Sequence, residues 1–475
     1  SLAIDGSIGG AILVNAGGLL TGSGTLTGPV QIGSGGTLNA GTGIATMTVA
    51  GDVAFLSGST FQVDASTRTA DRLAASGSVT IGSNVGFSVL ARNGNYAPLT
   101  SYTVLAAGGG VTGTFSTPTT NLAFLTPSLA YTGDSVILSL TRNSKKFSTA
   151  ATSTTAGLAD AVDGLGASNR LHSVLLNQTE AGAFAAFAAL GQTPLSDATN
   201  MVTGLGDGLQ LGGSGQSTIG ATLSYRAAHN PALTATTIGQ RFRLGNLSAM
   251  VVGGEREDRL DQDGAAAAIR TRFVEAGLAT GVGPLQLGLS ARTATSELDL
   301  ARTVTFPGFS ESLRSRGTID HRRIALHARS EHRIGPVTLA PQATYALEHL
   351  RFSALREHGG AAALTIEADR QRIHRATLGV GLATRPLTLG AVTVRPWADL
   401  AVETAWGDVD GRRQARLAGS EAFLLDDERS NRRSLLVDAG FDSELGALGW
   451  SLAYRGRIGE SRSDHGLAGT LRLRF

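Results

Sequence analysis

Charged side chains at every second position are the residues of this sequence that could do chemistry. From about residue 215 onward, arginine and glutamate alternate with apolar residues, and Lys145 and Lys146 are the only basic residues that are not arginine. A guanidinium pairs well with an enclosed carboxylate, through two parallel hydrogen bonds. We expect an interior that is either a structural ladder of ion pairs or a substrate-binding lining, built from Arg323, Arg329, Arg395, Glu403, Arg455, Arg457 and Arg472.

Other reaction chemistry is sparse in the sequence. The absence of cysteine removes disulfides, thiolate zinc sites and cysteine nucleophiles. The nine histidines form no HExxH or similarly spaced ligand set, and the Gly-rich turns at 108–110 and 212–215 lack the lysine of a phosphate loop. We therefore expect no metal and no cofactor. A net charge of +2 gives no indication of nucleic-acid binding.

Strands with one apolar and one polar face are the elements that would bring these charges together. Residues 448–458 (LGWSLAYRGRI) place leucine and aromatic residues at one parity and arginines at the other, and residues 320–334 and 393–406 divide similarly. Such segments have about 10 to 14 residues, about twice the length of strands in soluble sandwiches. Because a sheet in lipid must pair every backbone group, the pattern predicts a closed transmembrane β-barrel.

An even number of strands is expected in a bacterial barrel of one chain. Twelve segments fit the pattern, near residues 217, 232, 247, 269, 285, 320, 337, 373, 392, 435, 448 and 467. With an even number of strands, the first and the last strand both have their free termini on the periplasmic side. The chain that precedes the first strand must therefore pass through the lumen to reach the outside. Twelve strands enclose room for about one helix. We expect the part of the connector nearest the first strand to fill that space.

The N-terminal part of the chain differs in composition from the rest. Residues 1–141 contain few charges, and residues 12–22 are echoed 18 residues later, so that Val14 aligns with Ile32 and Leu20 with Leu38. A looser third copy occupies residues 53–63. Strand and glycine turn repeated at this period predict a parallel β-helix of stacked rungs. A small β-sandwich with glycine turns is the alternative.

An Ala-rich helical connector is expected between these parts. Residues 154–166 and 168–191 each begin with capping residues, and 196–210 form a weaker third helix. No apolar run reaches the length of a membrane-spanning helix. Residues 1–10 lack the order of a secretory signal, so a chain that meets a membrane would be a mature or truncated product.

Residues 96–143 resemble the end of the passenger in bacterial autotransporters, an autochaperone-like segment that caps the β-helix. The matching residues are Tyr102, Gly110, Gly113, Phe115, Phe124 and Tyr131. Residues 215–475, most strongly 339–368, resemble the translocator barrel of the same family, although 5% aromatic residues make its interfacial girdles thin. The final strand resembles the outer-membrane sorting signal of such barrels, with one face formed by Leu467, Leu471, Leu473 and Phe475.

The resemblance implies a type V autotransporter of the all-β class. A right-handed parallel β-helix (1–95) and its cap (96–143) would be followed by a helical linker (144–214) and a 12-stranded antiparallel transmembrane β-barrel (215–475) with a helix in its lumen. The implied function is secretion and surface display of its own passenger, as a virulence factor or adhesin, without catalysis. Implied partners are outer-membrane lipid, the barrel-assembly machinery, periplasmic chaperones and the passenger itself, with the protein a monomer in the bacterial outer membrane.

Two alternatives stay open. The chain could be the membrane-bound remnant of an autotransporter esterase or protease whose catalytic passenger lies upstream of Ser1. A Gly-Asp-Ser triplet at 133–135 resembles the nucleophile motif of the esterases, but it has no accompanying esterase domain. The other alternative is a porin-like channel, against which the Gly-rich solenoid argues. Some relatives cut their own linker at an asparagine, and Asn169, Asn177 and Asn200 match only by residue type.

Overall fold

The computed structural model describes residues 1–475 apart from 42, 93–98, 204–217, 227–228, 263, 391, 427–430, 461–462 and 475. Two compact units divide the chain. The first contains Ser1–Leu190 with Thr305–Ser310 and Gly419–Glu421, and the second contains Gly191–Val304, Glu311–Ala418 and Ala422–Phe475. The boundary at 190/191 falls inside the segment that the sequence assigns to the linker.

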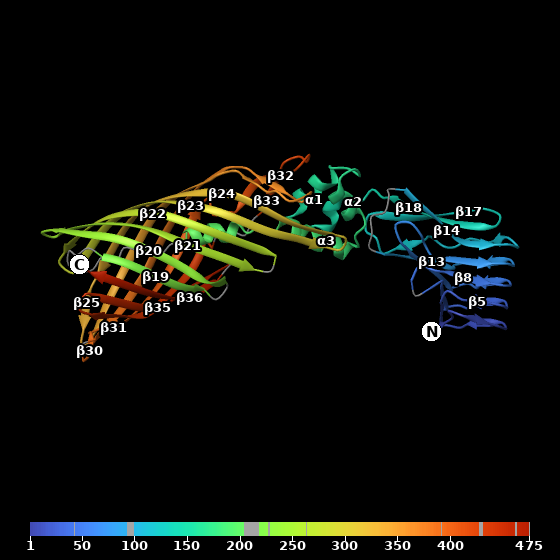
Figure 1. The fold of residues 1–475 in the computed structure, drawn as a ribbon, viewed down its shortest axis with the longest axis horizontal. Coiled ribbons are helices and arrows are strands. Elements are labelled where there is room, and N and C mark those ends of the chain that lie inside the picture. Colours follow the sequence, from blue (N-terminus) through green and yellow to red (C-terminus); the bar gives the residue numbers. More distant parts are fainter. Residues whose placement is uncertain are drawn as a thin grey trace. The chain divides into compact units, whose positions relative to one another are not determined.

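Three sheets wind through the first unit as a β-helix (Figure 1). One sheet contains β1 (Leu2–Ala3), β4 (Leu19–Thr21), β7 (Thr37–Asn39), β10 (Thr60–Ala65), β13 (Gly86–Ala91) and β16 (Thr119–Thr120). A second contains β2 (Ser7–Ile8), β5 (Thr25–Leu26), β8 (Thr46–Val49), β11 (Arg72–Ala75), β14 (Leu99–Ala107), β18 (Ser135–Arg142) and β17 (Leu125–Tyr131). The third contains β3 (Ile12–Val14), β6 (Val30–Ile32), β9 (Val53–Phe55), β12 (Val79–Ile81) and β15 (Val111–Thr112).

The repeat found in the sequence is the pairing register of the rungs. Val14 pairs with Ile32 and Leu20 with Leu38, in parallel ladders. Leu38 is in turn paired with Phe61 of the looser third copy. These side chains are buried, so each rung covers the apolar face of its neighbour. The parallel β-helix is therefore confirmed, and the sandwich alternative is wrong.

A buried carboxyl group lies inside this solenoid. Asp71 is 0% exposed. Its Oδ1 accepts a hydrogen bond from the backbone N–H of Ala45, and its Oδ2 accepts one from the N–H of Asp64, both at 2.9 Å. Burial disfavours the charged form more than these two bonds favour it, which raises the pKa of Asp71 to about 6.

The connector is helical, as expected, but its long segment is broken. The observed helices are α1 (Ala156–Asp163), α2 (Arg170–Leu176), α3 (Glu180–Gly191) and α4 (Leu195–Thr203), after a 3-10 turn at Phe147–Ala150. A single helix over 168–191 is wrong, because Asn177 caps the end of α2. The hydroxyl of Thr179 then accepts the N–H of Gly182 in the first turn of α3. No helix in the described residues is long and apolar enough to span a membrane.

Long antiparallel strands form the second unit (Figure 1). Its sheet has fourteen strands, of which β25 (His332–Ile334) and β30 (Leu387–Leu389) continue the lines of β24 and β29 past a break. Twelve long strands remain, and pairing of β24 with β26 closes the ring. They are β19 (Thr218–Arg226), β20 (His229–Leu244), β21 (Leu247–Gln262), β22 (Ala265–Val282), β23 (Leu285–Phe306), β24 (Phe309–Ser330), β26 (Val337–Phe352), β29 (Asp369–Thr384), β31 (Val392–Gly407), β34 (Arg433–Leu445), β35 (Leu448–Gly459) and β36 (Ser463–Arg474).

The two ends of the barrel differ in their connections. Tight turns at one end place Gly245, Gly283, Gly335 and Gly446 at φ values of 59° to 63°, a left-handed conformation that glycine adopts without strain. Longer segments at the other end fold into a small sheet of β27 (Leu355–Arg356), β28 (Leu364–Ile366), β32 (Arg412–Leu417) and β33 (Phe423–Asp426). Short turns face the periplasm in such barrels and long loops face outward.

Burial in the barrel is inverted relative to a soluble protein. Large apolar side chains are exposed on the outer face, with Leu378 at 68%, Ile324 at 55% and Leu471 at 53%. Charged residues on the inner face are buried, among them Glu275 at 1% and Glu348 at 2%. An apolar outside around a polar inside is the arrangement that lipid requires. The transmembrane barrel predicted from alternation is confirmed.

Candidate functional site: the charged interior of the barrel

The helix α4 occupies the interior of the barrel. It contacts strands β21 and β22, and Figure 1 shows the short green helix within the curled sheet. Leu195, Ala198, Met201 and Val202 are buried. The hydroxyl of Thr199 donates to the carbonyl of Leu195 at 2.8 Å, so this polar group is satisfied within the helix. α4 is the helix nearest the first strand, and its identity as the segment that plugs the pore stays a prediction.

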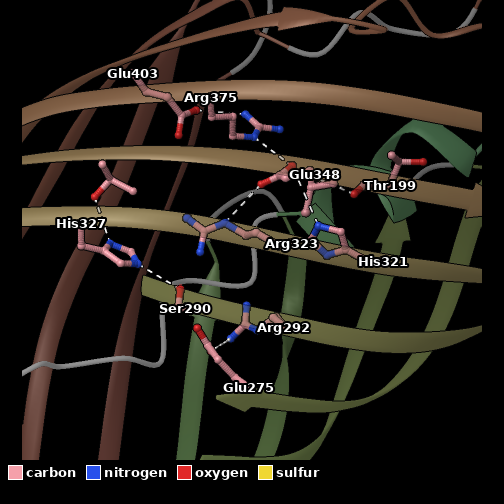
Figure 2. Close-up of polar contacts among 12 residues, drawn as sticks. Thr199, Glu275, Ser290, Arg292, His321, Arg323, His327, Glu348, Arg375 and Glu403 are labelled. Carbon is pink, nitrogen blue, oxygen red and sulfur yellow. Dashed lines mark hydrogen bonds and ion pairs between the residues drawn. The ribbon is translucent and has the colours of Figure 1, made fainter. Parts of the chain in front are cut away.

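A chain of alternating charges runs along the inner wall, and we call it the lumen ladder. It consists of Arg323, Glu348, Arg375, Glu403 and Arg457, from strands β24, β26, β29, β31 and β35. The successive N–O distances are 3.5, 3.1, 3.0 and 2.6 Å. Figure 2 shows Glu348 between Arg323 and Arg375. Each buried carboxylate therefore has two guanidinium partners, which offsets the cost of removing it from water.

Additional polar groups extend this interior. Arg292 of β23 pairs with Glu275 of β22 at 3.0 Å, and the two residues lie directly opposite in the ladder of hydrogen bonds. The Nε2 atom of His321 lies 3.9 Å from Glu348. His327 lies between the hydroxyls of Ser290 and Thr344, at 3.0 and 3.2 Å (Figure 2). Every second residue of each strand faces the lumen, so the polar residues at these positions form a continuous inner wall.

A second cluster, which we call the mouth latch, joins strand, loop and linker at the long-loop end. Arg302 of β23 holds Glu357 through two hydrogen bonds, from Nε at 2.8 Å and from Nη2 at 2.9 Å. The same guanidinium donates to the carbonyls of Ala362 at 3.2 Å and Gln192 at 3.1 Å. Glu357 also accepts the N–H of Leu364. Gln192 lies three residues before the start of α4, so the latch fixes the chain close to the helix.

The predicted interior residues fall into three groups. Arg323, Glu403 and Arg457 belong to the lumen ladder. Arg329 donates to Gln342 at 3.2 Å and lies 3.6 Å from Glu331. Arg472 lies 3.8 Å from Asp442. The remaining two, Arg395 and Arg455, are exposed. Arg395 lies on the same face of β31 as Glu403, and Arg455 on the same face of β35 as Arg457.

The cap-like residues of the first unit surround its last rung. Phe115 contacts the rings of Phe55, Phe61 and Phe87, with centroids 5.2 to 5.8 Å away. The N–H of Phe115 donates to the hydroxyl of Tyr131 at 2.9 Å. The remaining cap-like residues also hold defined places. Tyr102 donates to the carbonyl of Ser66, Gly110 and Gly113 have φ of 94° and 86°, and Phe124 is fully buried against Phe147.

Burial changes the ionisation of groups in and near this cap. The pKa of Tyr102 is raised to about 12 and that of Tyr131 is also raised, because burial disfavours the phenolate. His172 of α2 lies 5.1 Å from the ring of Phe147, and burial lowers its pKa. The two tyrosines are therefore neutral over the ordinary pH range. They serve packing and hydrogen bonding in the first unit.

The last strand closes the barrel. β36 pairs with β35 on one side and with the first strand, β19, on the other. Leu467, Leu471 and Leu473 are about half exposed on its outer face. Phe475 lies outside the described residues. The position of the leucines is that of side chains in contact with lipid, and their reading as a sorting signal stays a prediction.

The remaining residues singled out in the sequence occupy local structural roles. Ser135 is the first residue of β18, and its hydroxyl is 2.5 Å from that of Thr132 in the preceding turn. Asn169 caps α2 by accepting the N–H groups of Leu171 and His172. The Nδ2 of Asn177 donates to the carbonyl of Ser173 at 2.6 Å. Asn200 is in α4, and its side chain lies outside the described part.

Sequence reasoning missed several buried charges, among them Glu348, Arg375 and Arg302. A signal was present for Arg302, which shares its parity with Leu298, Leu300 and Val304 on β23. An arginine whose nearest neighbours on a buried face are apolar requires a buried partner. The partner, Glu357, lies on a loop 55 residues later, a separation that alternation does not reveal.

Comparisons with known proteins agree with this geometry. A family model for the autotransporter beta-domain matches residues 205–455. Two curated proteins, each named extracellular serine protease from Serratia marcescens, are 33% and 24% identical over 175 and 195 residues. These matches cover 35% and 41% of this chain, and 17% and 19% of the relatives. The chain thus spans less than a fifth of their length.

Two solved structures also match the chain. The translocator domain of NalP from Neisseria meningitidis has a TM-score of 0.44 and 16% identity, covering 61% of this chain and 97% of that one. The beta domain of the Bordetella protein BrkA has a TM-score of 0.41 and 16% identity, covering 55% and 100%.

Proposed function

The chain belongs to the autotransporter beta-domain family, and from that premise we propose that it secretes its own N-terminal β-helix and anchors it at the cell surface. Its place is the outer membrane. The observation that carries the proposal is the presence of α4 inside a closed twelve-strand barrel. Because α4 directly precedes the barrel strands in sequence, the upstream chain runs through the pore that the barrel encloses.

The interior is suited to retaining this segment after passage. The lumen ladder offers paired charges, whereas the described faces of α4 are mainly apolar. Because the charges of the wall are already paired with one another, a segment that moves through the pore forms few bonds with them. Retention comes from the mouth latch, which holds one carbonyl of the linker once transport has ended. In this proposal the β-helix is the cargo, its cap promotes folding outside, and the barrel-assembly machinery and periplasmic chaperones act only during insertion.

Surface labelling tests the proposal. The chain has no cysteine, so single cysteines at Ser57 in a solenoid turn and at Ala447 in a short barrel turn give unambiguous signals. Both positions are exposed. On intact Gram-negative cells a membrane-impermeant maleimide should label the Ser57→Cys protein and leave the Ala447→Cys protein unlabelled until the outer membrane is permeabilised. Protection of Ser57→Cys on intact cells would contradict the proposal.

A second proposal concerns the cargo. The curated relatives carry the name extracellular serine protease, and this chain covers only 17% and 19% of them. We propose as the alternative that the β-helix described here belongs to a longer secreted enzyme of that class. The parent reading frame decides between the two, because an upstream domain with a serine nucleophile supports the enzyme and an upstream run of further rungs supports an adhesin.

A further inference from the structure

A group of exposed arginines lies on the outer face of β24, β26 and β29, and we call it the outer arginine patch. It comprises Arg322, Arg351, Arg370 and Arg372, all exposed, together with His349. These residues have the parity of the lipid-facing side chains, not that of the lumen. Ile324 and Leu378, for example, have the same parity as Arg322 and Arg372 and are 55% and 68% exposed.

The strand register places these groups side by side. Arg322 is opposite His349, which is opposite Arg372, so one row crosses three strands. In the next row Arg351 is opposite Arg370. Arg351 and Arg370 are like charges in directly opposed positions, which destabilises a sheet. An anion from outside the chain would relieve this repulsion.

The patch lies where the apolar band of the barrel ends. In the row adjoining Arg322–His349–Arg372, toward the short turns, are Ile324, Leu347 and His374. His374 stacks on Trp406 with centroids 5.6 Å apart and hydrogen bonds with the hydroxyl of Tyr345 at 2.7 Å. Aromatic side chains mark the level of lipid headgroups. The long loops follow on the other side, so the patch is at the outward-facing margin of the membrane.

The same level on neighbouring strands is neutralised within the protein. On β22, Arg270 lies 2.7 Å from Glu257, and Arg272 lies 3.6 Å from Glu255. In the patch, four arginines outnumber the two nearby carboxylates, each of which accepts a hydrogen bond from another group. Asp320, opposite Arg351, accepts the hydroxyl of Thr295 at 2.8 Å, and Asp408 accepts the backbone N–H of Arg372 at 2.9 Å. Within the described part of the chain, the four guanidinium groups of the patch form no ion pair.

We propose that the outer arginine patch binds the phosphate groups of a phosphorylated glycolipid in the outer leaflet, of the lipid A type. The planar fork of arginine matches phosphate, and four forks on three strands can hold more than one phosphate. The adjoining band of Ile324, Leu347 and Leu378 receives the acyl chains. This continuity of cationic and apolar surface selects a lipid over a soluble anion or an acidic protein. The inference rests on the placement of the barrel in the outer membrane.

Binding of labelled diphosphoryl lipid A to the purified full chain in nonionic detergent tests the inference. The test variant is Arg322→Gln/Arg370→Gln/Arg372→Gln. Its matched control is Arg243→Gln/Arg333→Gln/Arg385→Gln, which removes the same charge from exposed arginines near the short turns. The patch variant should bind about tenfold more weakly or worse, and the control should bind as the unsubstituted chain does.

Further arms identify the ligand. Dephosphorylated lipid A should bind the unsubstituted chain about as weakly as diphosphoryl lipid A binds the patch variant, and millimolar inorganic phosphate should compete poorly. Equal loss in both triple variants, or equal binding of the dephosphorylated lipid, would overturn the inference. Efficient competition by inorganic phosphate would overturn it in favour of a soluble anion. Surface labelling at Ser57→Cys in the patch variant separates this failure from failure of secretion, which the variant should leave intact.

Discussion

Replacement of Arg302 by alanine is the sharpest perturbation that the structure offers. It removes two charge-assisted hydrogen bonds to Glu357, each worth about 1.5–3 kcal/mol, and leaves a carboxylate that is 9% exposed with the N–H of Leu364 as its remaining hydrogen bond in the latch. The carbonyls of Ala362 and Gln192 also lose a donor. Breaking a buried ion pair from one side costs about 3–5 kcal/mol, which is the loss we expect in the unfolding free energy of the barrel.

Companion variants separate charge from geometry. Arg302→Lys keeps the charge but cannot meet both carboxylate oxygens and both carbonyls, so it should recover part of the loss. Arg302→Met/Glu357→Leu removes both charges and should recover most of it, because no charge is left buried alone. Urea titration of the full chain in detergent gives these values from the shift in midpoint.

A functional readout belongs with the stability measurement. If the bond to Gln192 holds the linker in the pore, the Arg302→Ala barrel should conduct ions across a planar bilayer more often than the unsubstituted chain. A loss of stability below about 0.5 kcal/mol would refute the account of the latch. A full loss of stability with unchanged conductance would refute its hold on the linker, leaving Arg302 as an anchor of the loop alone.

Three further predictions follow from buried and lipid-facing groups. Glu348→Gln should destabilise the barrel by about 3 kcal/mol, the low end for a broken buried pair, because Arg375 keeps Glu403 although Arg323 loses its partner in the ladder. Glu331→Gln, at an exposed pair, should cost under about 0.5 kcal/mol, and urea titration measures both changes. Leu378→Arg should cost about 2–4 kcal/mol in lipid vesicles, and Leu56→Arg on the solenoid surface almost nothing; equal effects would contradict a lipid-facing Leu378. Because the folded pKa of Asp71 is raised from 3.8 to about 6, the folded solenoid binds its proton more tightly than the unfolded chain does. The contribution of Asp71 to the stability of the solenoid should therefore be greatest below about pH 4, fall by about 3 kcal/mol as the pH rises to about 6, and stay level above. Proteolysis of the solenoid in urea measures this stability. The Asp71→Asn variant should show no such pH dependence.

Alternation along the chain was sufficient to predict the barrel because lipid imposes one rule on every strand. Each of the twelve expected segments corresponds to a strand, and the repeat that aligned Val14 with Ile32 is a real register. Strand length was less predictable. β23 and β24 each span 22 residues, since their alternation continues beyond the apolar band into polar sequence that resembles a loop.

Contacts between distant segments were the part that the sequence could not provide. The lumen ladder depends on register across five strands, and the mouth latch joins residues 192, 302 and 357. The helix break at Asn177 was likewise hidden, because apolar spacing continues through it while capping decides where the backbone leaves the helix. The outer arginines were counted in the sequence, but only the register shows that three strands present them together.

Depth-dependent quenching of single tryptophans most directly tests the claim that these strands face lipid on one side and an enclosed interior on the other. With Trp397, Trp406 and Trp450 replaced by phenylalanine, tryptophan would be placed at Leu378 or at its neighbour Thr377, in vesicles of brominated phospholipid. Strong quenching at 378 and little at 377 is the predicted result. Equal quenching at both positions, or none at either, would contradict the account.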